Sequence, residues 1–358
     1  MRRLIGTSAD LELVGEARNG VEALALIPEV HPHVVCTDLH MPKMDGLTLT
    51  QEIMRRHPLP ILVISVAVSQ GCENAFKLLE AGAIDIFSKP RAGLDGKGAP
   101  QQRVAVELVR KIKLLSGVSP IRRHSSNRHD NLDQRSDSRL KASSQNPPPP
   151  LPSKLPLPNT PPKGITRRRS QIVVIGSSTG GPQALRTIFS ALPPTFPMPI
   201  LCIQHISPGF QENMIEWLKE YARMPVQTAR QWDRPRDGVI YFPQEGHHLT
   251  VDGSGRFEHQ RSCLNDHGHC PSVDLAFRSV IDHYSSTIIG VLLSGMGDDG
   301  SEALLAIHRA GGTTIIQDEA SCVVFGMPGK AVALGAAQQV LPVKTIANKL
   351  LKLAANKR

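Results

Sequence analysis

The sequence predicts an α/β protein with two domains, each built on a parallel sheet covered by helices, and a flexible tether between them. Short β-branched runs alternate with helical patterns on both sides of the tether. The tether shows no apolar period, and 358 residues are too many for one compact core. The predicted boundaries are residues 1–117 for the first domain, 118–165 for the tether and 166–358 for the second domain.

The first domain shows short strand patterns separated by helical ones. β-branched runs predict strands within residues 33–39, 60–67 and 83–90. Apolar residues at helical spacing predict helices within residues 46–57 and 72–82. This alternation is typical of a parallel sheet.

The tether is rich in serine, arginine and aspartate and then becomes dense in proline. Such a stretch cannot bury enough apolar surface to offset its ordering entropy, and its proline half is expected to be an extended spacer. Much of the basic excess behind the formal net charge of +9 lies here, and aromatic residues make up only 4% of the chain. We therefore interpret the charge as solvating and expect no nucleic-acid partner.

The second domain repeats the alternation and is expected to be a doubly wound parallel sheet. Strands are predicted within residues 171–176, 199–205, 287–295 and 312–318. Helices are predicted within residues 182–192 and 301–312, the second ending at a glycine pair. Around residues 238–259 the helical pattern stops, and a β-hairpin is expected.

Composition and termini favour a cytoplasmic protein. No apolar run approaches the roughly 20 residues that cross a bilayer, so no membrane insertion is expected. The N-terminus turns polar too soon for a secretory signal. The six cysteines lack the spacing of a disulfide framework, which favours reduced thiols. We expect a monomer.

The stretch GSSTG at residues 176–180 satisfies the G-x-S-x-G pattern with Ser178 at its centre, directly between a strand and a helix. This is the context of a nucleophile elbow, whose glycines allow strained dihedrals and whose following helix offers N–H groups to an oxyanion. A glycine-rich turn can also hold a phosphate, although neither G-x-G-x-x-G nor a P-loop is present. The motif alone leaves both interpretations open.

Two further strand ends carry the partners that a nucleophilic serine needs. His205 ends the next strand, and Asp298 and Asp299 follow a later one. Carboxyl ends of parallel strands meet at one edge, where open α/β sheets place their sites. The order Ser, His, Asp differs from that of the α/β-hydrolase fold, so a different sheet is expected.

Five separated segments together resemble the catalytic domain of the CheB methylesterase family. They are IGSSTGGP, QHISPGF, PSVDLAFRSV, GVLLSGMGDDG and QDEASCVVFGMPGKAV, within residues 170–341. The resemblance implies a carboxylic ester hydrolase that removes methyl groups from glutamates of methyl-accepting chemoreceptors and releases methanol. Glutamine deamidation is implied as a possible companion activity.

The resemblance also implies roles for individual residues. It puts the nucleophile at Ser178, the base at His205 and the acid at Asp299. Thr179 and Met296 fall on positions that line the site, where backbone N–H groups would hold an oxyanion. No metal or organic cofactor is implied for this step.

One departure from the family pattern is Cys270, where family members commonly have arginine before PSVD. Cys263, His267 and His269 lie close to it in sequence, which suggests zinc, but the spacings fit no standard structural zinc site. We interpret the segment as a substrate-facing loop with one altered contact and expect no metal in this domain.

The first domain is similar to a two-component receiver of flavodoxin-like fold. Asp38, Ser65 and Lys89 each end a predicted strand, and a carboxylate, a hydroxyl and a lysine on one edge can stabilise a phosphoryl group. The resemblance implies that Asp38 is the phosphoacceptor, Ser65 the switch hydroxyl and Lys89 the phosphate partner. It further implies phosphorylation by a chemotaxis histidine kinase and regulation of the catalytic domain, with the unphosphorylated receiver packed over the catalytic crevice.

The receiver pattern is incomplete at its start. The first residues, MRRLIGTSADLELVGEA, resemble the end of the first helix running into the second strand. The first strand, with the acidic pair that helps bind Mg²⁺, is absent from this pattern, and in the order 2-1-3-4-5 that strand is interior. Either the true start lies upstream or the receiver is degenerate. We expect a gap beside strands 2 and 3 and impaired Mg²⁺ and phosphate binding by residues 1–117.

Two other functions stay open at this level. The chain could be a response regulator whose hydrolase-like domain only binds a partner, or a small-molecule serine esterase. Methanol release from methylated receptor would exclude the response regulator without catalytic activity. Turnover of simple esters without activity on the receptor would indicate the small-molecule esterase. The sequence does not indicate which receptors are used.

Overall fold

The computed structural model describes residue 5 and residues 8–66, 73–89, 99–118, 171–261 and 269–355. The described residues within 1–122 and 169–358 form one compact unit. All of the tether after Val118 lies outside the described residues. None of the described helices has the length and hydropathy of a membrane-spanning segment.

The first domain contains a three-stranded parallel sheet in the order β1-β2-β3. Its elements are α2 (Gly20–Val30), β1 (Val35–Thr37), α3 (Gly46–Arg56), β2 (Ile61–Ser65), α4 (Glu73–Ala81), β3 (Asp85–Ser88) and α5 (Ala99–Ser116). The three predicted strands and two predicted helices of this domain are confirmed. Every side chain of β2 is buried, as expected for the central strand of a covered parallel sheet.

The predicted second receiver strand is wrong. Residues 8–17 are described, and they contain no strand. A second strand in this order would pair only with a first strand, and no such strand occurs among the described residues, so residues 8–17 have no hydrogen-bond ladder to join. A cavity of about 780 Å³ lies between Leu11 and Val14 on one side and Val35, Cys36 and Thr37 of β1 on the other. The expected gap beside the third strand is therefore present.

The second domain contains a seven-stranded sheet in the order β12-β11-β10-β4-β5-β7-β6, and every pairing in it is parallel. The strands are β4 (Ile172–Ser177), β5 (Ile200–Gln204), β6 (Val226–Thr228), β7 (Ile240–Phe242), β10 (Ile288–Leu292), β11 (Thr313–Gln317) and β12 (Gln339–Leu341). The helices are α6 (Gly181–Ala191), α7 (Gln211–Lys219), α8 (Val273–Ser279), α9 (Ile281–Tyr284), α10 (Ser301–Arg309), α11 (Met327–Ala333) and α12 (Val343–Ala355). The doubly wound parallel sheet is confirmed.

The predicted hairpin is shorter than expected. β8 (His247–Val251) and β9 (Phe257–Arg261) pair antiparallel, with His247 opposite Arg261. The preceding stretch, predicted as part of the same excursion, is β7 of the main sheet. A run of three buried residues in β7 marks it as an interior strand rather than a hairpin arm.

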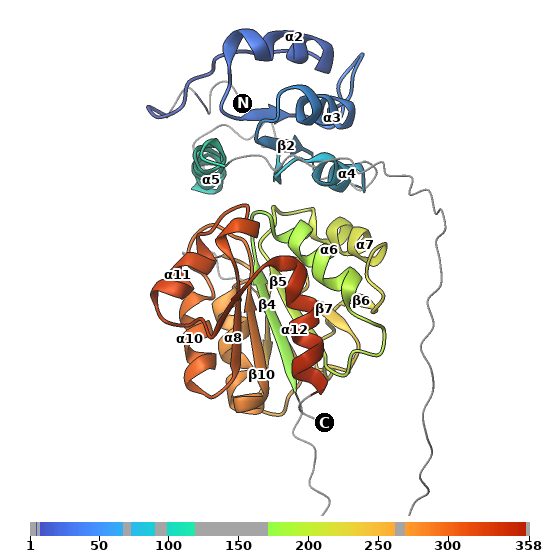
Figure 1. Ribbon diagram of the computed structural model, residues 1–358, viewed down its shortest axis with the longest axis vertical. Helices are drawn as coiled ribbons and strands as arrows, with labels where there is room; N and C mark the ends of the chain where they lie inside the picture. The colour runs from blue at the N-terminus through green and yellow to red at the C-terminus, as the bar shows by residue number, and fades with distance from the viewer. Residues whose placement is uncertain are drawn as a thin grey trace, which may run out of the picture. The chain divides into compact units, whose positions relative to one another are not determined.

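Helices cover both faces of the large sheet (Figure 1). Along β4, Val173 and Ile175 belong to a core with α6, α7 and α12, whereas Ile172 and Val174 belong to a core with α8, α10 and α11. All four side chains are fully buried, so β4 has no polar face. This explains its continuous apolar sequence.

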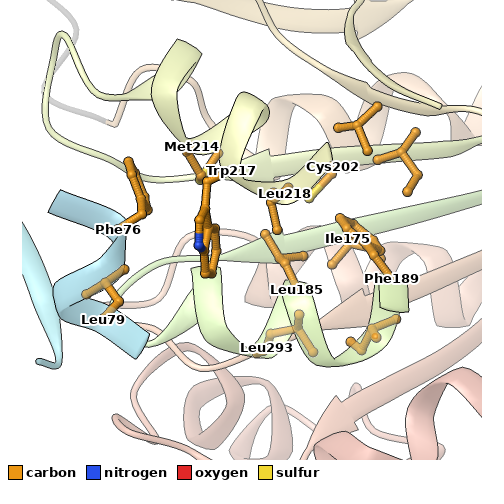
Figure 2. Packing of buried hydrophobic residues seen from close by; sticks show 14 of the residues in the cluster. Phe76, Leu79, Ile175, Leu185, Phe189, Cys202, Met214, Trp217, Leu218 and Leu293 are labelled. Atoms are coloured by element: carbon orange, nitrogen blue, oxygen red, sulfur yellow. The ribbon is translucent and has the colours of Figure 1, made fainter. Parts of the chain in front are cut away.

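The first core continues into the first domain. Figure 2 shows Phe76 and Leu79 of α4 beside Trp217 and Met214 of α7. The Phe76 and Trp217 rings stack with centroids 5.4 Å apart. Residues from two regions of the chain thus bury apolar surface together.

Candidate active site

The strand order brings three loops together at the carboxyl edge of the large sheet. β4 lies between β5 and β10, and each of these strands is followed by a loop that carries one predicted site residue. Chain order reverses at β4, since β5 lies on one side of it and β10 returns on the other. Such switch points are where open α/β sheets form their sites.

Ser178 follows β4 in a tight turn that leads into α6. Its backbone N–H donates to Ser294 O at 3.0 Å, and its carbonyl accepts from Gly181 N at 2.8 Å. The strained dihedral lies at Gly180, with φ at +79°, and not at the serine. Gly176 instead allows close packing, because a Cβ there would lie 2.4 Å from Val273 Cγ1. The predicted strand–turn–helix context is present, but positive φ is confined to one of its two flanking glycines.

The two neighbouring serines have different environments. Ser177 is fully buried, and its hydroxyl donates to Gln204 Oε1 at 2.6 Å. Ser178 is 7% exposed, and its hydroxyl forms no hydrogen bond within the part of the chain that the structure describes. Ser178 is therefore the hydroxyl that can meet a substrate.

His205 and Asp299 form a buried pair. His205 Nε2 lies 2.9 Å from Asp299 Oδ2, and the two side chains are 8% and 12% exposed. An ionised carboxylate only accepts hydrogen bonds, so Nε2 carries the proton and Nδ1 carries the lone pair. Nδ1 is buried and has no partner among the described residues. Asp298 is exposed, and Asp299 alone of this acidic pair contacts the imidazole.

The PSVD segment holds the acid in place. Asp299 accepts from Ser272 Oγ at 3.1 Å, from Val273 N at 2.8 Å and from Asp274 N at 2.9 Å. Burial alone would raise the pKa of Asp299. The hydrogen bond and charge of His205, with the Asp274 and Val273 N–H groups, instead lower the pKa to about 2. Asp299 is therefore an anion at neutral pH. The sequence offered these residues only as part of a resemblance, without this role.

Gln204 connects the nucleophile turn to the base. It is 3% exposed, and its Nε2 donates to Ser178 O at 2.8 Å and to His205 O at 2.7 Å. A Cβ on Gly181 would lie 2.0 Å from Gln204 Oε1, so glycine is needed for this approach. Sequence reasoning missed Gln204, and its only signal was its place beside His205 at the end of a strand.

The two residues predicted to supply oxyanion donors lie beside Ser178. Thr179 follows it directly, and a Cβ on Gly295, which precedes Met296, would lie 2.8 Å from Ser178 Cβ. Neither the Thr179 nor the Met296 amide donates a hydrogen bond within the described part of the chain. Both N–H groups are thus free to bind an oxyanion.

Comparison with known proteins identifies the family. Residues 173–350 match the family model described as CheB methylesterase, and residues 1–94 match the response regulator receiver domain. A protein-glutamate methylesterase/protein-glutamine glutaminase 3 of Hahella chejuensis is 38% identical over 96% of this chain and 91% of its own length. Another relative, protein-glutamate methylesterase/protein-glutamine glutaminase 2 of Methanospirillum hungatei, is 37% identical over 100% of this chain and 95% of its own. The chain belongs to the CheB methylesterase family.

Among solved structures, the Thermotoga maritima CheB methylesterase catalytic domain is 37% identical, with a TM-score of 0.49. It covers 51% of this chain and 98% of that chain.

The three residues predicted for phosphorylation also lie close together. Lys89 Nζ lies 2.8 Å from Asp38 Oδ2. Ser65 ends the adjacent strand, and its carbonyl accepts from Lys89 N at 2.7 Å. The structure thus brings all three predicted phosphorylation residues to one edge of the small sheet.

The described residues do not fit a receiver Mg²⁺ site. Asp38 Oδ2 is paired with Lys89, and its Oδ1 accepts from Leu39 N at 2.8 Å. No cluster of three histidine, cysteine, aspartate or glutamate side chains suited to a metal occurs in the described ranges. Of the residues that suggested a zinc site, Cys263 and His267 lie outside the described residues.

The receiver also contacts the nucleophile turn of the CheB methylesterase domain. Thr179 Oγ1 donates to Asp85 Oδ2 at 2.9 Å, and Lys111 Nζ pairs with the same oxygen. Gln183 Nε2 donates to the carbonyls of Ala83 at 3.2 Å and Ile84 at 3.3 Å. These contacts bring β3 and α5 of the receiver to the residue next to Ser178.

Proposed function

We propose that this chain hydrolyses glutamate methyl esters on chemoreceptors through a Ser178–His205–Asp299 triad and releases methanol. The observation that carries the proposal is the buried His205–Asp299 pair, with a free lone pair on Nδ1, at the same sheet edge as an unbonded serine. The full-length relatives named protein-glutamate methylesterase support the substrate class.

In the acylation step, Ser178 Oγ attacks the ester carbonyl while its proton passes to His205 Nδ1. Asp299 accepts the Nε2–H bond and stabilises the imidazolium that forms. The N–H groups of Thr179 and Met296 bind the developing oxyanion. The ester C–O bond then breaks, and the imidazolium returns a proton to the leaving methoxide, which departs as methanol.

In the second half, water attacks the acyl-enzyme as His205 Nδ1 takes its proton. Ser178 leaves with that proton, and a free glutamate side chain results. The same steps applied to a glutamine side chain release ammonia. Deamidation by this chain is part of the proposal.

The receiver contacts favour control of this site by the first domain. With Asp85 bound to Thr179, a receptor side chain and the receiver compete for one position. Phosphorylation of Asp38 would release this contact, but the described residues do not supply an acidic pair for Mg²⁺. A histidine kinase as phosphodonor, a cytoplasmic location and a monomeric state stay predictions.

The test replaces the nucleophile. Ser178→Ala should abolish methanol release from methylated receptor without loss of fold, because the hydroxyl makes no hydrogen bond within the described chain. The matched control is Ser190→Ala, which removes an exposed hydroxyl on α6. Gas chromatography of released methanol gives the rate, and turnover by folded Ser178→Ala protein would refute the assignment.

A further inference from the structure

A second imidazole lies flat on the catalytic base. The His269 and His205 rings stack with centroids 4.3 Å apart and an interplanar angle of 19°. His269 immediately precedes Cys270 and the segment that holds Asp299, and part of its surface is exposed. The catalytic triad does not use this residue.

The remaining contacts of His205 leave its ring with one anchor. Gln204 fixes the backbone carbonyl, and Asp299 binds Nε2, but Nδ1 has no partner among the described residues. A ring held at one nitrogen can still tilt about that hydrogen bond. A flat partner on its face removes this freedom, because tilting would separate the two rings or make them clash.

Charge is compatible with this role at neutral pH. The charged groups that face His269 are His205, Asp299, Arg110 and Lys111. His269 is exposed as a whole, but desolvation on the side of its ring that faces the site, together with His205 and the two receiver cations, lowers its pKa to about 4, and Asp299 only partly opposes this shift. His269 is therefore neutral when His205 takes up a proton, so the stack survives the step that makes the base cationic.

We propose that His269 is a positioning residue whose ring holds the plane of His205, so that Nδ1 keeps one orientation when it accepts the proton of Ser178. This inference rests on the proposed function as far as the natural substrate is concerned. Its test does not depend on that substrate. A fluorophosphonate that labels activated serines requires the same Ser178–His205 geometry and no receptor.

The experiment compares His269→Ala with His269→Phe in the full chain. Phenylalanine keeps a flat ring but has no nitrogen, so rescue by phenylalanine isolates stacking from hydrogen bonding. The control is His283→Ala, which removes a ring contact with Tyr284 in a region that supplies no triad residue. Circular dichroism verifies that each variant is folded.

We expect His269→Ala to lower kcat and the rate of Ser178 labelling by about 10- to 100-fold, with KM within about 2-fold of the parent, because small misplacements of a catalytic group cost that much. His269→Phe should stay within about 3-fold of the parent in both rates, and the control should be unchanged.

Three results would overturn the inference. They are an unaltered rate for folded His269→Ala, a His269→Phe as slow as the alanine variant, and a change in KM alone. If the parent protein labels at Ser178 but releases no methanol, the proposed substrate fails, and the labelling rates still decide the role of His269.

Discussion

The acid of the triad shows how one residue obtains its chemistry from a distant segment. Asp299 follows β10, but three of its four hydrogen bonds come from the start of α8, about 25 positions earlier. They keep the carboxylate ionised although it is nearly buried. The base is thereby given a fixed tautomer, with the lone pair on Nδ1.

Asp299→Asn tests this electrostatic role through stability. The pKa of Asp299 falls from 3.8 to about 2 on folding, so its stabilising effect is present above pH 3.8 and is lost as pH falls through 2. The free-energy difference between the parent and Asp299→Asn should shrink by about 2 kcal/mol between pH 5 and 2.

The two tryptophans give a direct readout for this measurement. Trp217 and Trp232 both lie in the catalytic domain, and Trp217 also contacts Phe76 and Glu80 of the receiver, so tryptophan fluorescence during urea unfolding follows that domain together with this receiver contact. A difference that does not depend on pH would show that Asp299 contributes nothing through its charge.

Among single residues, the sequence indicated the candidate triad but not the residues that hold the triad in place. The loops that carry Ser178, His205 and Asp299 were predictable because each follows a strand of one parallel sheet, whereas the choice of Asp299 over Asp298 came from the family resemblance. The roles of Gln204 and His269 were not predictable, since they depend on side-chain directions at the end of β5 and in the segment before α8. Asp299 contacts Nε2 of His205 and not Nδ1 because of the geometry of the loops. The spacing of residues in the sequence does not predict this geometry.

The turn between β4 and α6 requires glycine at position 180 for two separate reasons, its backbone dihedral angle and its close packing. Gly180 has positive φ, and a Cβ there would also lie 2.6 Å from Val323 Cβ and 2.9 Å from Ser294 Oγ. Ser294 in turn donates to Thr179 O at 2.7 Å. The shape of the turn is thus fixed from outside as well as by its own dihedrals.

Gly180→Ala and Gly246→Ala separate these reasons. Gly246 also has positive φ, at 73°, but a Cβ there meets nothing within 4 Å. Dihedral strain should cost each variant about 1 kcal/mol, and the clash should cost Gly180→Ala about 1–3 kcal/mol more, together with most of its activity. Urea unfolding and methanol release measure both, and equal losses in the two variants would exclude the packing argument.

Most elements were predictable from periodicity, and the two errors have one cause. The stretch before Gly20 reads as a strand, and β7 reads as a hairpin arm, because local pattern does not reveal which partner strand is available. In the first case no partner strand lies within the described part of the chain, and in the second the strand pairs with β5 of the large sheet.

For the whole molecule, Glu80 joins the receiver to the catalytic domain. It accepts hydrogen bonds from Trp217 Nε1 at 2.7 Å and from the Tyr221 hydroxyl, and Arg186 lies 3.5 Å away. The guanidinium of Arg186 also lies 5.5 Å from the centre of the Trp217 ring. The Glu80 carboxylate therefore contacts three side chains, one from α6, one from α7 and one from the residues after α7.

Glu80→Ala should weaken this contact and raise unstimulated methanol release by about 5-fold, the lower range of measured couplings between sites. Trp217 loses its hydrogen bond, so its fluorescence should shift as well. Glu29→Ala, an exposed carboxylate on α2, is the control. A shifted fluorescence without faster turnover would show that the contact does not restrain the enzyme.

The cavity beside β1 has a consequence for handling the protein. On that side β1 meets no neighbouring strand among the described residues, so its outward amides and carbonyls are available to another polypeptide. In concentrated samples the protein should aggregate by addition of a strand to the β1 edge of the receiver, and not through the sheet of the catalytic domain. Brief deuterium labelling would reveal this weak edge first.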